Sequence, residues 1–301
     1  MQTGISVLIP VYRENPTALL NQLLELKSTI RVPLEIIVAD DGSNEHYYQA
    51  WSVNFRDSEI QIFHTIKNLG RSAIRNFLWS KSSYTYRLFL DGDTFPIQKD
   101  FLQIYEEQIL NNPFVIYGGT YYRDIIPSKE KSLRYYYGVK REALTVEQRN
   151  APSYHHFTIN NVLCHYTVFE PYPFKEEING YGHEDTLLGM ELRAKNVSVL
   201  QIENGVYHDG LDNNDVFLFK TEEGINNLVS LYQQGKIDNS IRLIQTYEKL
   251  KSNLAGRMTL SILKSLRKTF RSAVHFFPSC LFFFDVFKLA QFTFRIQRHE
   301  H

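Results

Sequence analysis

The sequence contains little cysteine, carries no net charge and begins without a recognisable leader. Only Cys164 and Cys280 occur among its 301 residues. Two scattered thiols are too few for a disulfide framework or a thiolate metal site, which favours a reducing compartment. The chain has 33 basic and 33 acidic residues, so it has no overall field that would attract nucleic acid. Its opening, MQTGISVLIPVYRE, lacks a basic lead and is apolar only as far as Pro10, so we expect a cytoplasmic protein.

The charges that are present are unevenly placed. From Arg257 to the end there are eight Lys or Arg and two Asp or Glu, a net of +6, which leaves −6 for residues 1–256. The length and a hydrophobic content of 43% allow a substantial core. We expect two domains, of which the second is small.

Short apolar runs alternate with helical patterns through the first part of the chain. Runs typical of buried strands occupy residues 5–12, 34–43, 61–66 and 86–93. Patterns typical of amphipathic helices occupy residues 15–30, 47–55, 71–82 and 99–111. This alternation predicts an α/β fold with a mostly parallel central sheet covered by helices on both faces. In such sheets the ligand crevice lies beyond the carboxyl ends of the strands.

The rest of the chain is interpreted in the same way. Residues 123–156 have weak periodicity and predict an excursion of loop and helix. Regular patterns then predict a strand over 159–169, a helix over 180–196, one last strand over 197–210 that ends at His208, and two helices between residues 222 and 250.

Acidic turns follow two of the predicted strands. In RLFLDGD, Asp91 and Asp93 flank a glycine that lets the backbone turn sharply, so both carboxylates can point into the crevice. A divalent cation shared with a substrate phosphate would relieve their repulsion, because Mg2+ and Mn2+ prefer oxygen ligands. A solvated turn or a helix cap is the alternative. In VADDGS, Asp41 could accept a hydrogen bond from a base or a sugar, or it could simply cap its turn.

Two further motifs lie at predicted helix starts. In NLGRSAIRN, Gly70 permits a close approach, while Arg71 and Arg75 lie one helical turn apart, an arrangement suited to a diphosphate. Surface salt bridges are the competing interpretation. In NGYGHEDTLLGMEL, Glu184 and Asp185 begin a helix whose dipole keeps carboxylates ionised. An ionised Asp at a crevice can act as a general base toward an alcohol, although a helix cap is the alternative.

Five motifs occur together in the order SVLIPVYRE, EIIVADDGS, NLGRSAIRN, RLFLDGD and NGYGHEDTLLG. Their combination and spacing resemble family 2 glycosyltransferases with the GT-A fold, over about residues 4–220. The resemblance implies a Rossmann-like catalytic domain over residues 1–220. Its nucleotide-sugar half would cover about 1–118 and its acceptor half about 119–220, and a helical extension would follow over 221–301.

The resemblance also implies roles for individual residues. Asp185 matches the catalytic base, and Glu184 matches a residue that orients the acceptor or shapes the site. Asp93 would bind Mn2+ or Mg2+ directly, Asp91 would lie against the ribose or a metal-bound water, and His208 would supply another metal ligand. Asp41 looks like the residue that holds the uracil ring. The residues expected to line the nucleotide-sugar are Pro10, Val11, Tyr12, Asp41, Asn68, Gly70, Arg71, Arg75, Asp91 and Gly92.

The implied reaction is metal-dependent transfer of a sugar, with inversion, from a UDP-sugar to a hydroxyl of a glycan or lipid-linked oligosaccharide. Enzymes that extend bacterial surface polysaccharides are of this kind. A retaining GT-A transferase, a nucleotidyltransferase and an inactive glycan-binding relative stay open as alternatives. An oxidoreductase is disfavoured because no Gly-x-Gly-x-x-Gly follows the first strand.

The C-terminal part combines basic and Phe-rich segments. Over residues 260–277 a stripe of Lys and Arg falls on one face of a predicted helix, with apolar residues on the other face. Residues 279–297 are rich in Phe, but Asp285 and Lys288 interrupt any span long enough to cross a bilayer. Both segments suit helices lying in an anionic membrane surface, which here would be the cytoplasmic face of the inner membrane. Packing on the catalytic domain and dimerisation through residues 257–297 are the alternatives.

Overall fold

The computed structural model describes residues 1–125, 127–151, 158–169, 173–176, 180–237 and 239–298. The chain forms two compact units. The first comprises residues 1–123, 141–177 and 184–210, and the second comprises residues 124–140, 178–183 and 211–301. Parts of the predicted acceptor half, at residues 126, 152–157, 170–172 and 177–179, lie outside the described residues.

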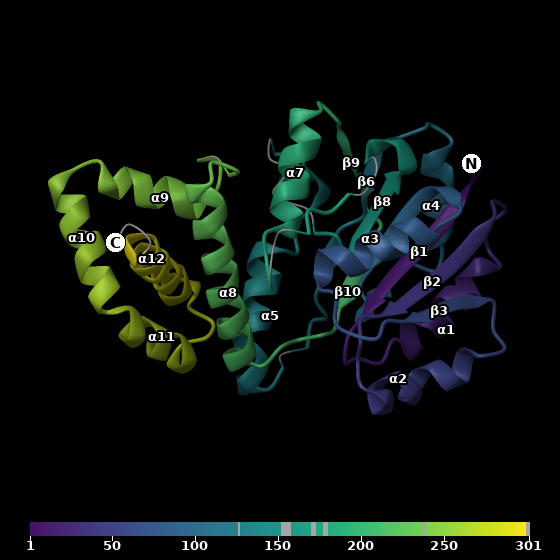
Figure 1. The fold of residues 1–301 in the computed structure, drawn as a ribbon, viewed down its shortest axis with the longest axis horizontal. Helices are drawn as coiled ribbons and strands as arrows, with labels where there is room; N and C mark the ends of the chain where they lie inside the picture. Colours follow the sequence, from purple (N-terminus) through teal and green to yellow (C-terminus); the bar gives the residue numbers. More distant parts are fainter. Residues whose placement is uncertain (126, 152–157, 170–172, 177–179, 238, 299–301) are drawn as a thin grey trace. The chain divides into compact units, whose positions relative to one another are not determined.

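A seven-stranded sheet forms the centre of the first unit (Figure 1). Its strands lie in the order β3-β2-β1-β4-β8-β6-β9. Their bounds are Gln2–Val11 (β1), Leu34–Asp40 (β2), Ile60–His64 (β3), Tyr84–Leu90 (β4), Val115–Tyr117 (β6), Asn161–His165 (β8) and Val199–Gln201 (β9). β1 pairs in parallel with β2 and β4, β2 with β3, and β6 with β9, whereas β8 runs antiparallel to β4 and β6. The predicted α/β class with a mostly parallel central sheet is confirmed.

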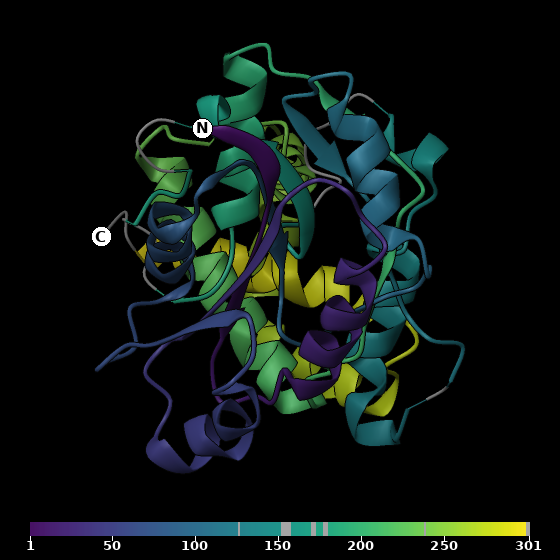
Figure 2. The same cartoon turned by 90° about the vertical axis from the view of Figure 1, so that its right-hand side faces the viewer.

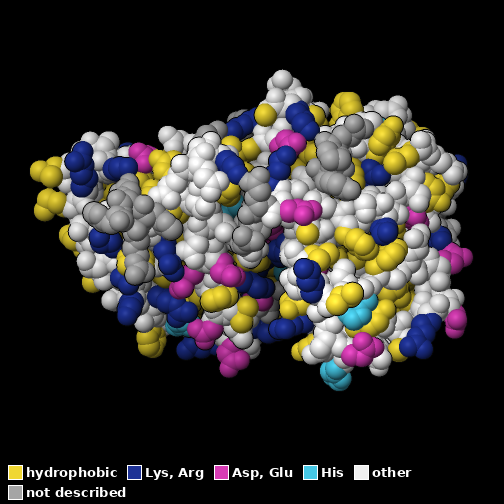
Figure 3. Space-filling view, viewed as in Figure 1, with side chains coloured by type: hydrophobic (Ala, Val, Ile, Leu, Met, Phe, Trp, Pro, Cys, Tyr) yellow, Lys and Arg dark blue, Asp and Glu magenta, His cyan; other side chains and the backbone are white. Residues whose placement is uncertain are grey.

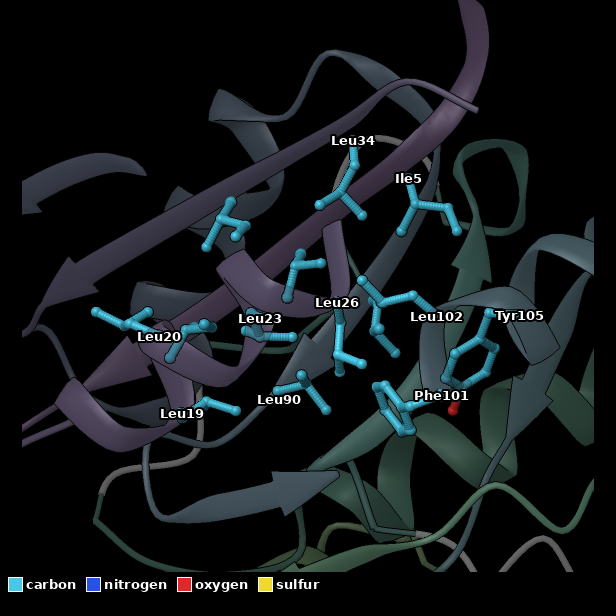
Figure 4. Packing of buried hydrophobic residues seen from close by; sticks show 14 of the residues in the cluster. Ile5, Leu19, Leu20, Leu23, Leu26, Leu34, Leu90, Phe101, Leu102 and Tyr105 are labelled. Carbon is cyan, nitrogen blue, oxygen red and sulfur yellow. The ribbon is translucent and has the colours of Figure 1, made fainter. Parts of the chain in front are cut away.

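Helices cover both faces of this sheet, because its central strands are apolar on both sides. On one face, leucines of α1 (Thr17–Lys27) and aromatic rings of α4 (Phe101–Ile109) pack with Ile5 of β1 (Figure 4). On the other face, α3 (Arg71–Lys81) packs in the cluster that contains Leu8 of the same strand. Burying one such leucine contributes about 1.5–3 kcal/mol, so these unbroken apolar runs favour a sheet that is covered twice.

Further helical segments lie in the described residues of this unit. They are α2 (Glu45–Ser52), α6 (Val146–Arg149), α7 (Glu184–Ala194) and the 3-10 turns at Val53–Phe55 and Tyr166–Val168.

A small sheet of the first unit places strand ends near the acidic turns. It consists of β5 (Thr94–Pro96), β10 (Val206–His208) and β7 (Thr120–Tyr121), in that order. The prediction of one strand over 197–210 was wrong, because β9 and β10 belong to different sheets. Asn204 lies between them, and its buried side chain donates to the Phe101 carbonyl at 3.0 Å, which ties this segment to the start of α4.

The second unit is helical. It contains most of α5 (Ser132–Arg141), the 3-10 turn Lys129–Lys131, and the helices α8 (Asn214–Gln233), α9 (Arg242–Lys251), α10 (Leu254–Ser265), α11 (Arg267–Phe276) and α12 (Leu281–Arg298). Helices α8 to α11 surround α12 (Figure 1), and Figure 2 shows the yellow α12 from another side. Because α12 contacts each of these four helices, it is the hydrophobic centre of this unit.

Two expectations for the C-terminal part are corrected. The helix expected over 260–277 is broken at Leu266, where the backbone leaves the helical conformation between α10 and α11. The Phe-rich segment 279–297 is not a surface helix, since Phe284, Phe287 and Phe292 of α12 are fully buried within the unit. Among the described helices, none has the length and apolar character needed to cross a bilayer.

Candidate active site

The carboxyl ends of β1, β2 and β4 lie side by side, because β1 is the parallel neighbour of both other strands. Pro10 and Val11 end β1, and Tyr12 follows it. The Asp41 N–H donates to the Val11 carbonyl at 2.8 Å, which ties the turn after β2 to the end of β1. The expected location of the acidic turns, at the carboxyl edge of the sheet, is confirmed.

The Asp41 carboxylate organises the loop that precedes α3. Its Oδ1 accepts the Leu69 N–H at 2.7 Å, and its Oδ2 accepts the Gly70 N–H at 3.0 Å. The Asn68 amide donates to the Asp41 carbonyl at 3.1 Å. Burial raises the pKa of Asp41, and the two backbone N–H groups oppose that rise. The loop is therefore held in place by hydrogen bonds to Asp41. Gly70 was expected to permit a close approach, but a Cβ built there would have no atom within 4 Å, and the residue is marked instead by its φ of +90°.

Arg71 and Arg75, at the start of α3, each contact an acid from another segment. Arg75 is buried, and its Nη2 donates to Asp91 Oδ1 at 2.6 Å. The Arg71 Nε donates to Glu184 Oε1. Burial by itself raises the pKa of Asp91, but the nearby charges of Arg75 and Arg71 outweigh burial and lower it. Asp91 is therefore an ionised partner of Arg75, and this pairing relieves part of the repulsion within the acidic turn.

Asp93 follows Asp91 and Gly92 in the same turn and lies beside His208. The strand β10 pairs antiparallel with β5, which sets His208 opposite Thr94. The distance from Asp93 Oδ2 to His208 Nε2 is 3.6 Å. Asp93 Oδ1 and His208 Nδ1 are buried and have no hydrogen-bond partner within the described part of the chain. A buried carboxylate oxygen without a partner is costly, so this pair has capacity for a further ligand.

A divalent cation suits this pair of side chains. A carboxylate oxygen and an imidazole nitrogen are donors that Mn2+ accepts, and the orphaned Asp93 Oδ1 has room for one more bond. Across the described ranges, no three His, Cys, Asp or Glu side chains are grouped to hold a metal ion. A cation on Asp93 and His208 would therefore complete its shell with substrate phosphates and water, as such ions commonly do. Asp91 was also expected near the cation, as a ligand or against a metal-bound water, and its Oδ1 pairs with Arg75.

The helix α7 begins with two adjacent acids whose environments differ. Burial raises the pKa of Glu184, but Arg71 and Arg75 outweigh burial and lower it. For Asp185, burial and the neighbouring Glu184 charge raise the pKa to about 7, and the same two arginines oppose only part of that rise. Asp185 Oδ1 is buried, with no hydrogen-bond partner among the residues described. Adjacent acids with pKa values pushed apart are typical of acid–base sites.

The predicted site residues form one connected constellation in the first unit. Asp185 interacts electrostatically with Asp91, Arg71 and Arg75, although they lie about a hundred residues away in the sequence. The direct contacts join Val11 to Asp41, Asp41 to Gly70, Arg71 to Glu184, Arg75 to Asp91, and Asp93 to His208. The structure thus brings together acids from the ends of β2 and β4 and from the start of α7.

The arrangement requires glycine at two positions, 42 and 210, and neither requirement was predicted from the sequence. A Cβ at Gly210 would lie 1.7 Å from Asp93 Oδ2, so only glycine leaves room for that carboxylate. Gly42 has a φ of +72°, and a Cβ there would lie 2.3 Å from the Lys67 carbonyl carbon, so glycine lets the two loops approach. Gly42 stands in the quoted VADDGS motif, whereas Gly210 is marked only by its position after His208.

Comparison with known proteins gives a family match and structural neighbours. A sequence model described as glycosyl transferase family 2 matches residues 6–170. An uncharacterised glycosyltransferase of Rickettsia felis is 32% identical over 127 residues, which are 41% of this chain and 20% of that protein. The matched part of the chain thus spans about a fifth of the length of that protein and of a second glycosyltransferase, from Rickettsia conorii.

Two solved structures share the fold. The mannosyltransferase PcManGT from Pyrobaculum calidifontis, in complex with GDP-Man and Mn2+, superimposes with a TM-score of 0.60 at 12% identity, covering 100% of this chain and 89% of that one. Glucosyl-3-phosphoglycerate synthase from Mycobacterium tuberculosis, in complex with Mn2+, UDP and glucosyl-3-phosphoglycerate, gives a TM-score of 0.50 at 15% identity, with coverages of 79% and 82%. At these identities the likeness concerns the fold, and the GT-A architecture expected from the sequence is confirmed.

Proposed function

Since the chain belongs to glycosyl transferase family 2, we propose that it moves a sugar from a UDP-sugar to an acceptor hydroxyl with inversion at the anomeric carbon. One observation carries the proposal: Asp185 lies in the constellation that contains Asp91, Arg71 and Arg75, its pKa is raised, and one of its oxygens has no hydrogen-bond partner among the described residues. The Mn2+ and nucleotide named for the two structural neighbours support a nucleotide-sugar as donor. The acceptor is proposed to be a glycan or a lipid-linked glycan.

Asp185 is assigned as the general base. A base works best when its pKa lies near the operating pH, because it must be ionised and must still hold a proton well. The pKa of about 7 for Asp185 meets both conditions, whereas Glu184 stays ionised beside Arg71. Asp185 would take the proton of the acceptor hydroxyl as that oxygen attacks, and the bond from the anomeric carbon to the diphosphate would break. Glu184 would keep the start of α7 and Arg71 in position.

The donor is assigned to the carboxyl ends of β1, β2 and β4. The backbone around Val11 and the loop held by Asp41 would line the nucleoside, and Arg71 would face the diphosphate. Arg71 is partly exposed and so can reach a phosphate, whereas Arg75 is buried against Asp91. Fixed groups of this kind reduce the barrier mainly through positioning and charge stabilisation.

Asp93 and His208 are assigned as the side chains that would hold Mn2+ or Mg2+. A bound cation would supply positive charge to the diphosphate. Asp91 would act by fixing Arg75 and would not bind the cation with its Oδ1.

The test compares Asp185→Asn with the parent chain in two measurements. Calorimetry with UDP and Mn2+ should give equal affinities, because the base does not hold the nucleotide. UDP release from a UDP-sugar, with water as the acceptor, should fall by about 10²–10⁴-fold, the usual contribution of a general base. Glu191→Gln, on the same helix but paired with Lys195, is the matched control and should keep the parent rate. Parent-like UDP release by Asp185→Asn would refute the assignment.

The donor and the stereochemistry need their own readouts. GDP and UDP should be titrated in parallel, and tighter binding of GDP would refute the proposed UDP-sugar. Proton NMR of the first sugar product reports its anomeric configuration, which should be opposite to that of the donor.

A further inference from the structure

The helix α10 exposes an apolar stripe on the second unit. Leu254, Met258 and Ile262 recur every fourth residue, so they lie on one side of the helix. They are 75%, 61% and 57% exposed, while Gly256 and Leu260 form the buried side of α10. Figure 3 shows hydrophobic side chains gathered over α10 at the left edge, next to Lys and Arg side chains. Large apolar side chains in a row on a surface mark a place where something else binds.

Further exposed aromatic side chains follow at the turn between α11 and α12. Phe276, Phe277 and Phe282 are all exposed, although most other phenylalanines of α12 are buried. The second unit therefore has a buried aromatic core, and these three rings are exposed in addition to it.

The charge of this region has one sign. Between Glu248 and Asp285 there are seven Lys or Arg and no Asp or Glu. Arg271 is neutralised by Glu222 of α8, but Arg257 and Lys268 are exposed. Two acids in contact with this region, Asp215 and Glu222, belong to α8 and pair with Arg271 and His275 of α11. An apolar stripe flanked by cations, with no acid in its own helix, has the composition of a helix that lies in an anionic bilayer surface.

We propose that α10 and the turn between α11 and α12 dock this protein on the surface of an anionic lipid bilayer. Leu254, Met258 and Ile262 enter the boundary between headgroups and acyl chains, while Arg257 and Lys268 face the phosphates. This site differs from the surface expected from the sequence, because most phenylalanines of α12 are buried, and because Leu254 and Met258 of α10 lie before the segment 260–277. The inference does not depend on the proposed reaction, since no residue of the candidate active site takes part.

The test is co-sedimentation of the full chain with vesicles of equal parts phosphatidylcholine and phosphatidylglycerol, compared with vesicles of phosphatidylcholine alone. The parent chain should bind the anionic vesicles and be released by high salt, because salt screens exposed charges. Leu254→Ser with Ile262→Ser should weaken binding at least tenfold. Leu110→Ser with Ile125→Ser removes the same two residue types at positions 75% and 69% exposed, and should bind like the parent.

The charge is tested separately. Arg257→Gln with Lys268→Gln should weaken binding to anionic vesicles about 30-fold. Arg56→Gln with Lys99→Gln removes one arginine and one lysine that are also exposed, and should change binding little.

Two outcomes would overturn the proposal. Equal losses of vesicle binding in the test and control variants would show that α10 is not the contact. A second copy of this chain is the competing occupant of the stripe. The stripe would be a dimer interface if light scattering showed a dimer for the parent and a monomer for Leu254→Ser with Ile262→Ser, and if neither protein bound vesicles. Circular dichroism melts of all variants should agree with the parent, because every substituted side chain is exposed.

Discussion

Replacing Asp185 by Asn should stabilise the protein while it stops the reaction. The difference between the usual pKa of 3.8 and the folded value of about 7 corresponds to about 4 kcal/mol above pH 7. This is the cost of holding the ionised carboxylate beside Glu184 and away from water. An amide there is imperfectly hydrogen-bonded, which costs about 1–2 kcal/mol. We expect a net gain in the free energy of unfolding of about 2 kcal/mol at about pH 8, or about 4 °C in Tm.

The sign depends on pH. Because the folded pKa of Asp185 is raised, its contribution to stability is fully present below the unfolded pKa and is lost as pH rises toward 7. The gain from Asp185→Asn should therefore be largest above pH 7 and should disappear toward pH 5, because about 2–3 kcal/mol of the ionisation cost is gone at that pH. Urea unfolding at the two pH values, followed by circular dichroism, measures both numbers.

Glu184→Gln is the matched control, and we expect it to change the free energy of unfolding in the opposite direction. The folded pKa of Glu184 is lowered, so its stabilising effect is present above its unfolded pKa and is lost as pH falls through the folded value. Its replacement removes the partner of Arg71 and should destabilise the protein by about 1–2 kcal/mol at about pH 8. If Asp185→Asn were as stable as the parent at both pH values, the raised pKa of Asp185 would be refuted.

Three further substitutions probe the rest of the site. Asp93→Ala should weaken Mn2+-dependent UDP binding at least tenfold in calorimetry, and unchanged affinity would contradict its role in holding the cation. Gly210→Ala places a Cβ 1.7 Å from Asp93 Oδ2 and should displace that carboxylate, so UDP release should fall about tenfold or more even if the melting temperature drops little. A rate equal to that of the parent would show that the position of Asp93 does not matter for the reaction. Asp41→Asn leaves one oxygen for two backbone N–H groups, so hydrogen exchange at Leu69 and Gly70 should speed up, and equal protection would show that the loop does not depend on the carboxylate.

The first half of the catalytic unit was predictable because its information is local. The apolar runs that became β1, β2 and β4 are each bounded by acids or glycine, and parallel pairing follows from the helices between them. The acidic turns therefore had to meet at one edge of the sheet. The arginines of α3 could also be placed on one helical face from their spacing alone.

The features that could not be predicted from the sequence depend on contacts between distant segments. The pairing of Asp91 with Arg75 follows from the packing of α3 on the sheet and cannot be told from motif spacing. The division of residues 197–210 into two strands depends on Asn204 reaching Phe101. The requirement for glycine at position 210 exists only because β10 and β5 pair.

The C-terminal part shows a different limit of sequence analysis. Phe-rich composition says that a segment avoids water and does not say what it packs against. The phenylalanines of α12 found partners on α8 and α9, for example Phe284 with Phe217 and Phe292 with Tyr247. The exposed apolar stripe came instead from α10, which contains no phenylalanine.

The position of α12 at the centre of the second unit has a consequence for synthesis on the ribosome. Helices α8 to α11 are made first, and the sides of these helices that contact α12 are uncovered until residues 281–298 have left the exit tunnel. Nascent chains expose such surfaces to chaperones and to one another during that interval. Removing α12 alone would leave α8 to α11 without the helix that all four contact, so damage to residues 281–298 should be as harmful to this unit as damage to α8.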